Sequence, residues 1–65
     1  MLSNSELYDK LEKQFGVEKM ISASFVISTM FNHIYESSPK EEVINEASYE
    51  RDWWMDKHYE LTKNN

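Results

Sequence analysis

The chain has no cysteine, which excludes disulfide bonds, thiolate metal ligands and cysteine nucleophiles together. One glycine and one proline among 65 residues leave few turn signals, so a few long helices are favoured over many short strands. A lone glycine also rules out the glycine-rich loops that bind phosphate groups. The N-terminal stretch lacks a basic segment followed by an apolar one, so we expect no signal peptide and a cytoplasmic protein.

Basic side chains are scarce as well, with 7 Lys and Arg against 12 Asp and Glu and a formal net charge of −5. Because an acidic chain repels phosphate backbones, we expect no direct binding of nucleic acid. The uncharged stretch 20–35 is shorter than the roughly 20 apolar residues that cross a bilayer, and polar side chains interrupt it. The sequence therefore predicts no membrane span.

What the chain does have is a hydrophobic fraction of 40%, which is too rich for a disordered protein. Apolar residues recur at helical spacing and predict one all-α domain over residues 1–65, with three helices at about 4–15, 17–36 and 39–62. Ser3 and Glu6 predict a capping box at the first helix. Gly16 follows Phe15 where a left-handed helix stop is expected.

A second capping box, formed by Ser38 and Glu41 with Pro39 at the first helical position, predicts where the third helix begins. The second and third helices are then expected to form a long antiparallel hairpin that turns at residues 37–38. That turn places Val17 near His58. The shorter N-terminal helix is expected to pack across one end of the hairpin.

The third helix carries two adjacent tryptophans that point about 100° apart. Trp54 aligns with Val43 and Leu61, so we predict that it belongs to the core. Trp53 points toward the acidic side, where Tyr49 stands one turn before it. One interpretation is that a small protein simply leaves some aromatic surface exposed, or lays Trp53 against a loop.

The other interpretation, which we favour, is an aromatic pair surrounded by carboxylates and suited to a protein partner, because tryptophan and tyrosine are enriched at interface hot spots. The predicted partner-binding surface comprises Tyr49, Trp53, Glu42, Glu46, Asp52, Asp56 and Glu60.

A second predicted surface lies at the tip of the hairpin. If the first helix folds back at Gly16, it covers only residues 17–28 of the second helix. Apolar side chains beyond that point would stay uncovered, over an area at the scale of an interaction site. We predict self-association, most simply as a twofold dimer, through Met30, Phe31, Ile34, Tyr35, Val43 and Ile44.

Catalytic and metal-binding constellations are weak. His33 and His58 have no acid partner that can be placed beside them, and the helix separates His58 from Asp52 and Asp56. We therefore predict no catalytic residue, metal or cofactor. We do not expect a DNA-binding helix-turn-helix motif around Gly16, because the helix that would read the bases lacks the exposed basic and amide side chains needed for this.

Two functions remain open at this point. The first is a small non-catalytic protein–protein interaction protein, acting as an oligomeric adaptor, regulator or assembly subunit. The second is an acidic inhibitor that occupies the basic groove of a nucleic-acid-binding protein by charge mimicry. Binding that depends on aromatic and tip residues would favour the first, and binding that falls with salt would favour the second.

Overall fold

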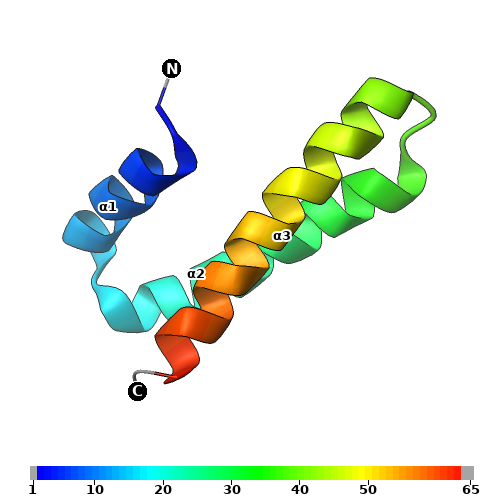
Figure 1. Ribbon diagram of the computed structural model, residues 1–65. Helices are drawn as coiled ribbons and strands as arrows, with labels where there is room; N and C mark the ends of the chain where they lie inside the picture. The colour runs from blue at the N-terminus through cyan, green and yellow to red at the C-terminus, as the bar shows by residue number, and fades with distance from the viewer. Residues whose placement is uncertain (1, 64–65) are drawn as a thin grey trace.

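The computed structural model describes residues 2–63, which form three helices: α1 (Asn4–Phe15), α2 (Val17–Ser37) and α3 (Glu41–Lys63). α2 and α3 lie side by side as an antiparallel hairpin, and α1 packs near the end of the hairpin that lies away from its turn (Figure 1). This arrangement confirms the predicted all-α fold of a long hairpin with a shorter N-terminal helix. None of the described helices is both long and apolar enough to cross a membrane.

The two ends of α1 follow the local sequence. The Glu6 backbone N–H donates to Ser3 Oγ at 3.2 Å, and the Ser3 hydroxyl donates to the Glu6 carboxylate at 3.1 Å. Gly16 has φ 90° and ψ 158°, a conformation that is essentially restricted to glycine. Its N–H donates to the Glu12 carbonyl at 2.8 Å, and its own carbonyl accepts from the Met20 N–H at 3.2 Å. One glycine therefore ends α1 and begins α2, which reverses the chain in a single residue.

The start of α3 differs from the prediction. α3 begins at Glu41, two residues later than expected, and the Lys40 carbonyl accepts from the Ile44 N–H at 3.0 Å. Ser38 Oγ accepts from the Lys40 N–H at 3.3 Å and makes no capping bond to Glu41. A short-range turn at Ser38 has therefore replaced the predicted capping box, as serine side chains can bond the backbone two residues on.

The longer turn shifts the register of the hairpin. His58 Nδ1 lies 2.8 Å from the carbonyl oxygen of Ile21, about one helical turn beyond Val17, its predicted neighbour. The Ser28 hydroxyl, which donates to the Arg51 carbonyl at 2.8 Å, follows the same register. Because the chain reverses at residues 38–40 and not at 37–38, every α3 residue meets a later part of α2 than predicted.

The core lies where α2 meets α3 beneath α1. Trp54 is only 1% exposed, which confirms its predicted place in the core, and Met20 and Tyr8 are buried with it. Ser24 and Ser28 are also fully buried. Their small side chains let the two helices approach closely, and both hydroxyls are satisfied, Ser24 by the Ile21 carbonyl at 3.0 Å and Ser28 by α3.

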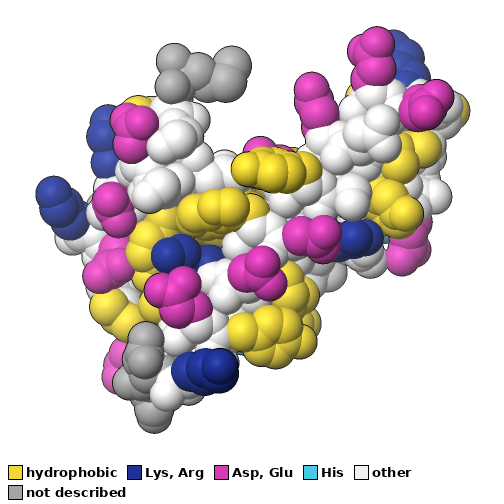
Figure 2. Space-filling model, viewed as in Figure 1, with side chains coloured by type: hydrophobic (Ala, Val, Ile, Leu, Met, Phe, Trp, Pro, Cys, Tyr) yellow, Lys and Arg dark blue, Asp and Glu magenta, His cyan; other side chains and the backbone are white. Residues whose placement is uncertain are grey.

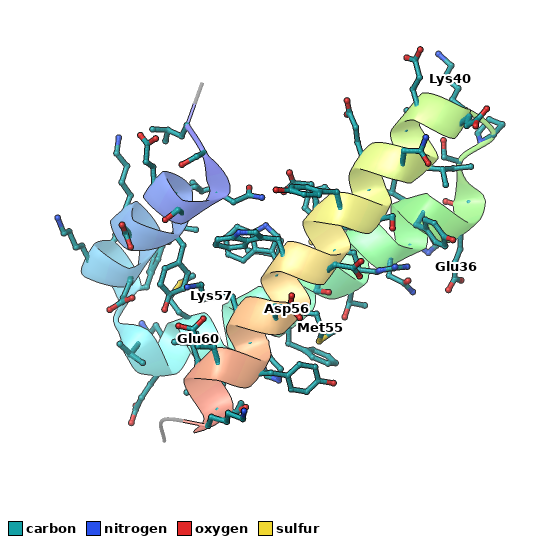
Figure 3. The ribbon with its side chains drawn as sticks, in the orientation of Figure 1. Glu36, Lys40, Met55, Asp56, Lys57 and Glu60 are labelled. Atoms are coloured by element: carbon teal, nitrogen blue, oxygen red, sulfur yellow. The ribbon has the colours of Figure 1, made fainter. Side chains whose placement is uncertain are left out.

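α1 is held to α3 through aromatic contacts. The Tyr8 ring lies 6.5 Å from the Trp54 ring, between centroids, and Lys57 Nζ stands 4.7 Å from the Tyr8 centroid and 5.4 Å from that of Trp53. Figure 3 shows Lys57 reaching from α3 toward α1, with Glu60, its ion-pair partner at 3.6 Å, one turn along the helix. Burial, assisted by the neighbouring Glu12 carboxylate, raises the pKa of the Tyr8 phenol to about 12.

Candidate functional site

α1 covers only part of one face of the hairpin. Ala23 and Ile27 of α2 pack with Leu11 of α1 against the core, whereas Met30, further along the same side, is 61% exposed. α1 has 12 residues and α2 has 21, or about 18 Å against about 32 Å. The half of this face nearest the hairpin turn is therefore left open.

The open half forms a groove with an apolar floor. Phe31 and Ile34 of α2 and Val43 and Ala47 of α3 line it, and its volume is about 650 Å³. We call this the hairpin groove. It is an open surface depression and not an enclosed cavity, so it suits an elongated partner better than a small molecule.

The rim of the hairpin groove is acidic and aromatic. Glu46, Glu50 and Asn45 line it together with Tyr49, which is 67% exposed, and no Lys or Arg of residues 2–63 does so. Figure 2 shows carboxylates and apolar side chains side by side along α3 in this view. The groove therefore pairs an uncovered apolar floor with negative charge on its α3 side.

Trp53, predicted to stand among the carboxylates, is half-buried. Its ring packs edge-on against Trp54 with centroids 4.9 Å apart. Trp53 also lines a hollow with the start of α1, from Leu2 to Ser5, and shares this hollow with Tyr49 and Glu50. Trp53 was predicted to point away from the core, but it packs partly against it, because residues at the start of α1 lie over that side of α3 and the edge-to-face geometry lets both indoles reach the core.

The other residues of the predicted partner-binding surface lie along α3. Glu46 and Tyr49 line the hairpin groove, and Glu42, Asp56 and Glu60 are exposed on the same side of the helix, because neighbouring members of the set are three or four residues apart. Asp52 instead pairs with Arg51 at 3.1 Å and lines a different hollow. Partner binding by these residues stays a prediction.

The residues of the predicted self-association patch lie on two faces of the hairpin tip. Phe31, Ile34 and Val43 line the hairpin groove. Tyr35 instead lies under the Arg51 guanidinium, whose carbon is 4.6 Å from the ring centroid. Ile44 is on the same side of α3 as Arg51, because it precedes Arg51 by seven residues, or about two helical turns. The prediction treated the tip as one surface, but the hairpin has two faces there.

The face opposite α1 carries a second hollow that the sequence interpretation missed. Phe25 and Met55 line it with Asn32, Arg51 and Asp52, and Arg51 Nη1 donates to Asn32 Oδ1 at 3.1 Å. Phe25 is 48% exposed. The signal available in the sequence was the unusually wide apolar stripe of α2, which places Phe25 away from its centre.

His58 has a structural role. Because a carbonyl oxygen can only accept, the contact with Ile21 identifies Nδ1 as the protonated nitrogen. Its ring lies between those of Phe25, at 5.3 Å, and Tyr59, at 5.7 Å between centroids. Within the described chain, no three His, Asp or Glu side chains gather as metal ligands.

Comparisons with family models, with curated proteins and with solved structures found no match for this chain. The hairpin groove and the hollow on the opposite face are therefore the features from which its function can be inferred.

Proposed function

We propose that this chain is a non-catalytic protein–protein interaction protein, acting as an oligomeric adaptor, regulator or assembly subunit, and that the hairpin groove is its docking site. The observation that carries the proposal is the apolar floor that α1 leaves uncovered. Apolar surface of this kind rimmed by polar groups typically marks an interaction site. Tyr49 supplies an exposed aromatic anchor at the rim, of the type that interfaces favour.

The test compares proteins captured by two variants with those captured by the unmutated chain. Ile34→Asp places a charge on the groove floor, and Val26→Asp places the same charge on an exposed α2 position outside the groove. We expect a captured protein that is lost with Ile34→Asp and retained with Val26→Asp, after circular dichroism has shown both variants to be helical. If every captured protein survives Ile34→Asp, the groove is not the docking site.

Self-association through the face opposite α1 is the second part of the proposal. That face exposes Phe25 and, at 60%, Tyr59, and it carries charges of both signs on Arg51 and Asp52. Two copies meeting through their hairpin grooves would instead bring acidic rims together, which like-charge repulsion disfavours. We expect a dimer at micromolar concentration in analytical ultracentrifugation that Phe25→Glu dissociates and Ile34→Glu does not; a monomer at high concentration would contradict this.

Charge mimicry is the alternative, and one observation favours it. Glu42, Glu46 and Asp56 are exposed on α3, and none of them forms an ion pair with another described residue. An inhibitor of this kind would lose binding when Glu42 and Asp56, outside the groove, become glutamine, and its affinity would fall steeply with salt. Binding that depends on Ile34 and is insensitive to those two substitutions would exclude it.

A further inference from the structure

We infer that the occupant of the hairpin groove is an amphipathic helix of a different protein, with an apolar stripe flanked by Lys or Arg. This inference rests on the proposed function, because it specifies the chemistry of the partner that docks there.

A helix fits the groove because of what surrounds it. The groove runs between two antiparallel helices, on the face where Leu11 of α1 packs, together with Ala23 and Ile27 of α2, against the buried core. A helix packs into a groove between two other helices by placing its apolar side chains between theirs. Its own backbone N–H and carbonyl groups are already hydrogen-bonded within the helix. A partner helix would continue the layer that α1 begins.

The length of the groove sets the length of the partner. Along α3 it extends from Val43 to Glu50, about two helical turns or roughly 10 Å. Amphipathic helices that dock in grooves use anchors at positions i, i+3 or i+4 and i+7, which also span about two turns. Three or four apolar anchors of the partner would therefore meet Phe31, Ile34 and Val43.

The negative charge of the rim indicates that the partner carries positive charge beside its apolar stripe. Glu46 and Glu50 stand one turn apart on α3 and line the groove, and no basic side chain of the described residues lines it with them. Partner cations flanking the apolar stripe would meet these two carboxylates, while an acidic flank would be repelled.

A second copy of this chain fits the groove poorly. Its net charge is −5, and the exposed side of α1, its shortest amphipathic helix, carries Glu6 and Asp9 as well as lysines. The uncharged stretch of α2 already packs against α3 along its inner face. A helix of a different protein, with basic residues beside its apolar stripe, is therefore more complementary to the hairpin groove.

The probe is a synthetic helical peptide of about 14 residues, with leucine at i, i+3, i+4 and i+7 spacing and lysine at the flanking positions. One matched peptide replaces each lysine by glutamate, and another has the same lysine and leucine content in scrambled order. Fluorescence anisotropy of the labelled peptides, at about 0.15 M salt, measures binding to the full chain. We expect the ordered lysine peptide to bind at least about tenfold more tightly than either matched peptide.

Two double variants distinguish binding at the groove rim from general electrostatic attraction to the net negative charge of the chain. Glu46→Gln with Glu50→Gln removes the rim charges, and Glu18→Gln with Glu36→Gln removes as many exposed charges away from the groove. We expect the rim pair to weaken lysine-peptide binding about tenfold and the control pair to change it less than about twofold. Equal losses, or equal binding of the ordered and scrambled peptides, would overturn the inference.

Other outcomes distinguish failure of this inference from failure of the proposed function on which it rests. If the lysine peptide does not bind but Ile34→Asp still abolishes capture of a partner protein, the groove is a docking site for a different chemistry. If the chain self-associates and Ile34→Asp releases monomers, a second copy occupies the groove and the inference is wrong. If neither peptide nor partner depends on the groove, the proposed function fails as well.

Discussion

The two tryptophans of α3 should differ sharply in how much they stabilise the fold. Trp54 is fully buried, so truncation to alanine removes its packing and leaves a cavity, a change that typically costs about 3–5 kcal/mol. A domain of 65 residues has roughly 3–10 kcal/mol of stability in total, at about 0.05–0.15 kcal/mol per residue. Trp54→Ala should therefore remove a large share of the stability of the domain, and at the lower end of that range it should unfold most of the molecules.

Trp53 is half-buried, so Trp53→Ala forfeits about half of the burial that Trp54→Ala removes, whereas the edge-to-face contact between the two rings is lost in both variants. We expect a loss of about 1.5–2.5 kcal/mol and a cooperative transition that stays measurable.

Chemical denaturation followed by far-ultraviolet circular dichroism measures both losses on the same scale. Because Trp54→Ala could leave no folded population to titrate, Trp54→Phe and Trp53→Phe provide a milder pair that should preserve the order of the two effects. Equal losses for the two positions, or a larger loss at Trp53, would refute the assignment of Trp54 to the core and of Trp53 to its edge.

Three smaller predictions concern the turn, the buried phenol and the helix contact. Gly16→Ala should cost about 1–3 kcal/mol in chemical denaturation, since the backbone there is essentially restricted to glycine. Tyr8 has a folded-state pKa of about 12, above its ordinary value of 10, so its contribution should be complete below pH 10 and fall as the pH rises toward 12. In denaturation measured across this range, Tyr8→Phe should reduce that fall. Ser28→Ala should cost about 1 kcal/mol, because it removes a hydrogen bond between helices, and Ser24→Ala should cost less, because its bond is local.

Local signals in the sequence predicted most of the fold. The Ser3 cap and the stop at Gly16 each depend on residues within four positions of one another, and both are confirmed as helix ends. In detail they differ from the prediction, because the Glu6 carboxylate bonds the Ser3 hydroxyl and Gly16 adopts φ 90° and ψ 158° and not the left-handed helical conformation. The start of α3 was missed because two local hydrogen bonds compete at Ser38, one to Lys40 and one to Glu41. The sequence pattern fits both bonds and does not rank them, and the later start of α3 shifts the register of the whole hairpin.

The interior of the hairpin was harder to predict, because two serines, Ser24 and Ser28, are fully buried in it. A hydrophobic pattern assigns the core to large apolar residues, whereas close approach of two helices favours small ones whose hydroxyls can be satisfied by nearby carbonyls. Phe25, next to Ser24 in the chain, is exposed and lines the hollow on the face opposite α1.

The candidate site was predicted in part. The uncovered end of the hairpin follows from the short α1, and Phe31, Ile34 and Val43 do lie there around one groove. The division of the tip into two faces depends on the rotation of α2 and α3 about their axes, which only the packed structure defines. The half-buried position of Trp53 likewise depends on where α1 lies, and no local pattern predicts that.

NMR chemical-shift mapping with the ordered lysine peptide tests most directly the claim that the hairpin groove binds a basic amphipathic helix. Backbone and methyl resonances of Ile34, Val43 and Ala47 should shift on titration and saturate together, with Tyr49 and Glu50 following at the rim. Resonances of Phe25 and Met55 on the opposite face should stay in place. Shifts confined to that opposite face, or spread evenly over every exposed carboxylate, would contradict the account.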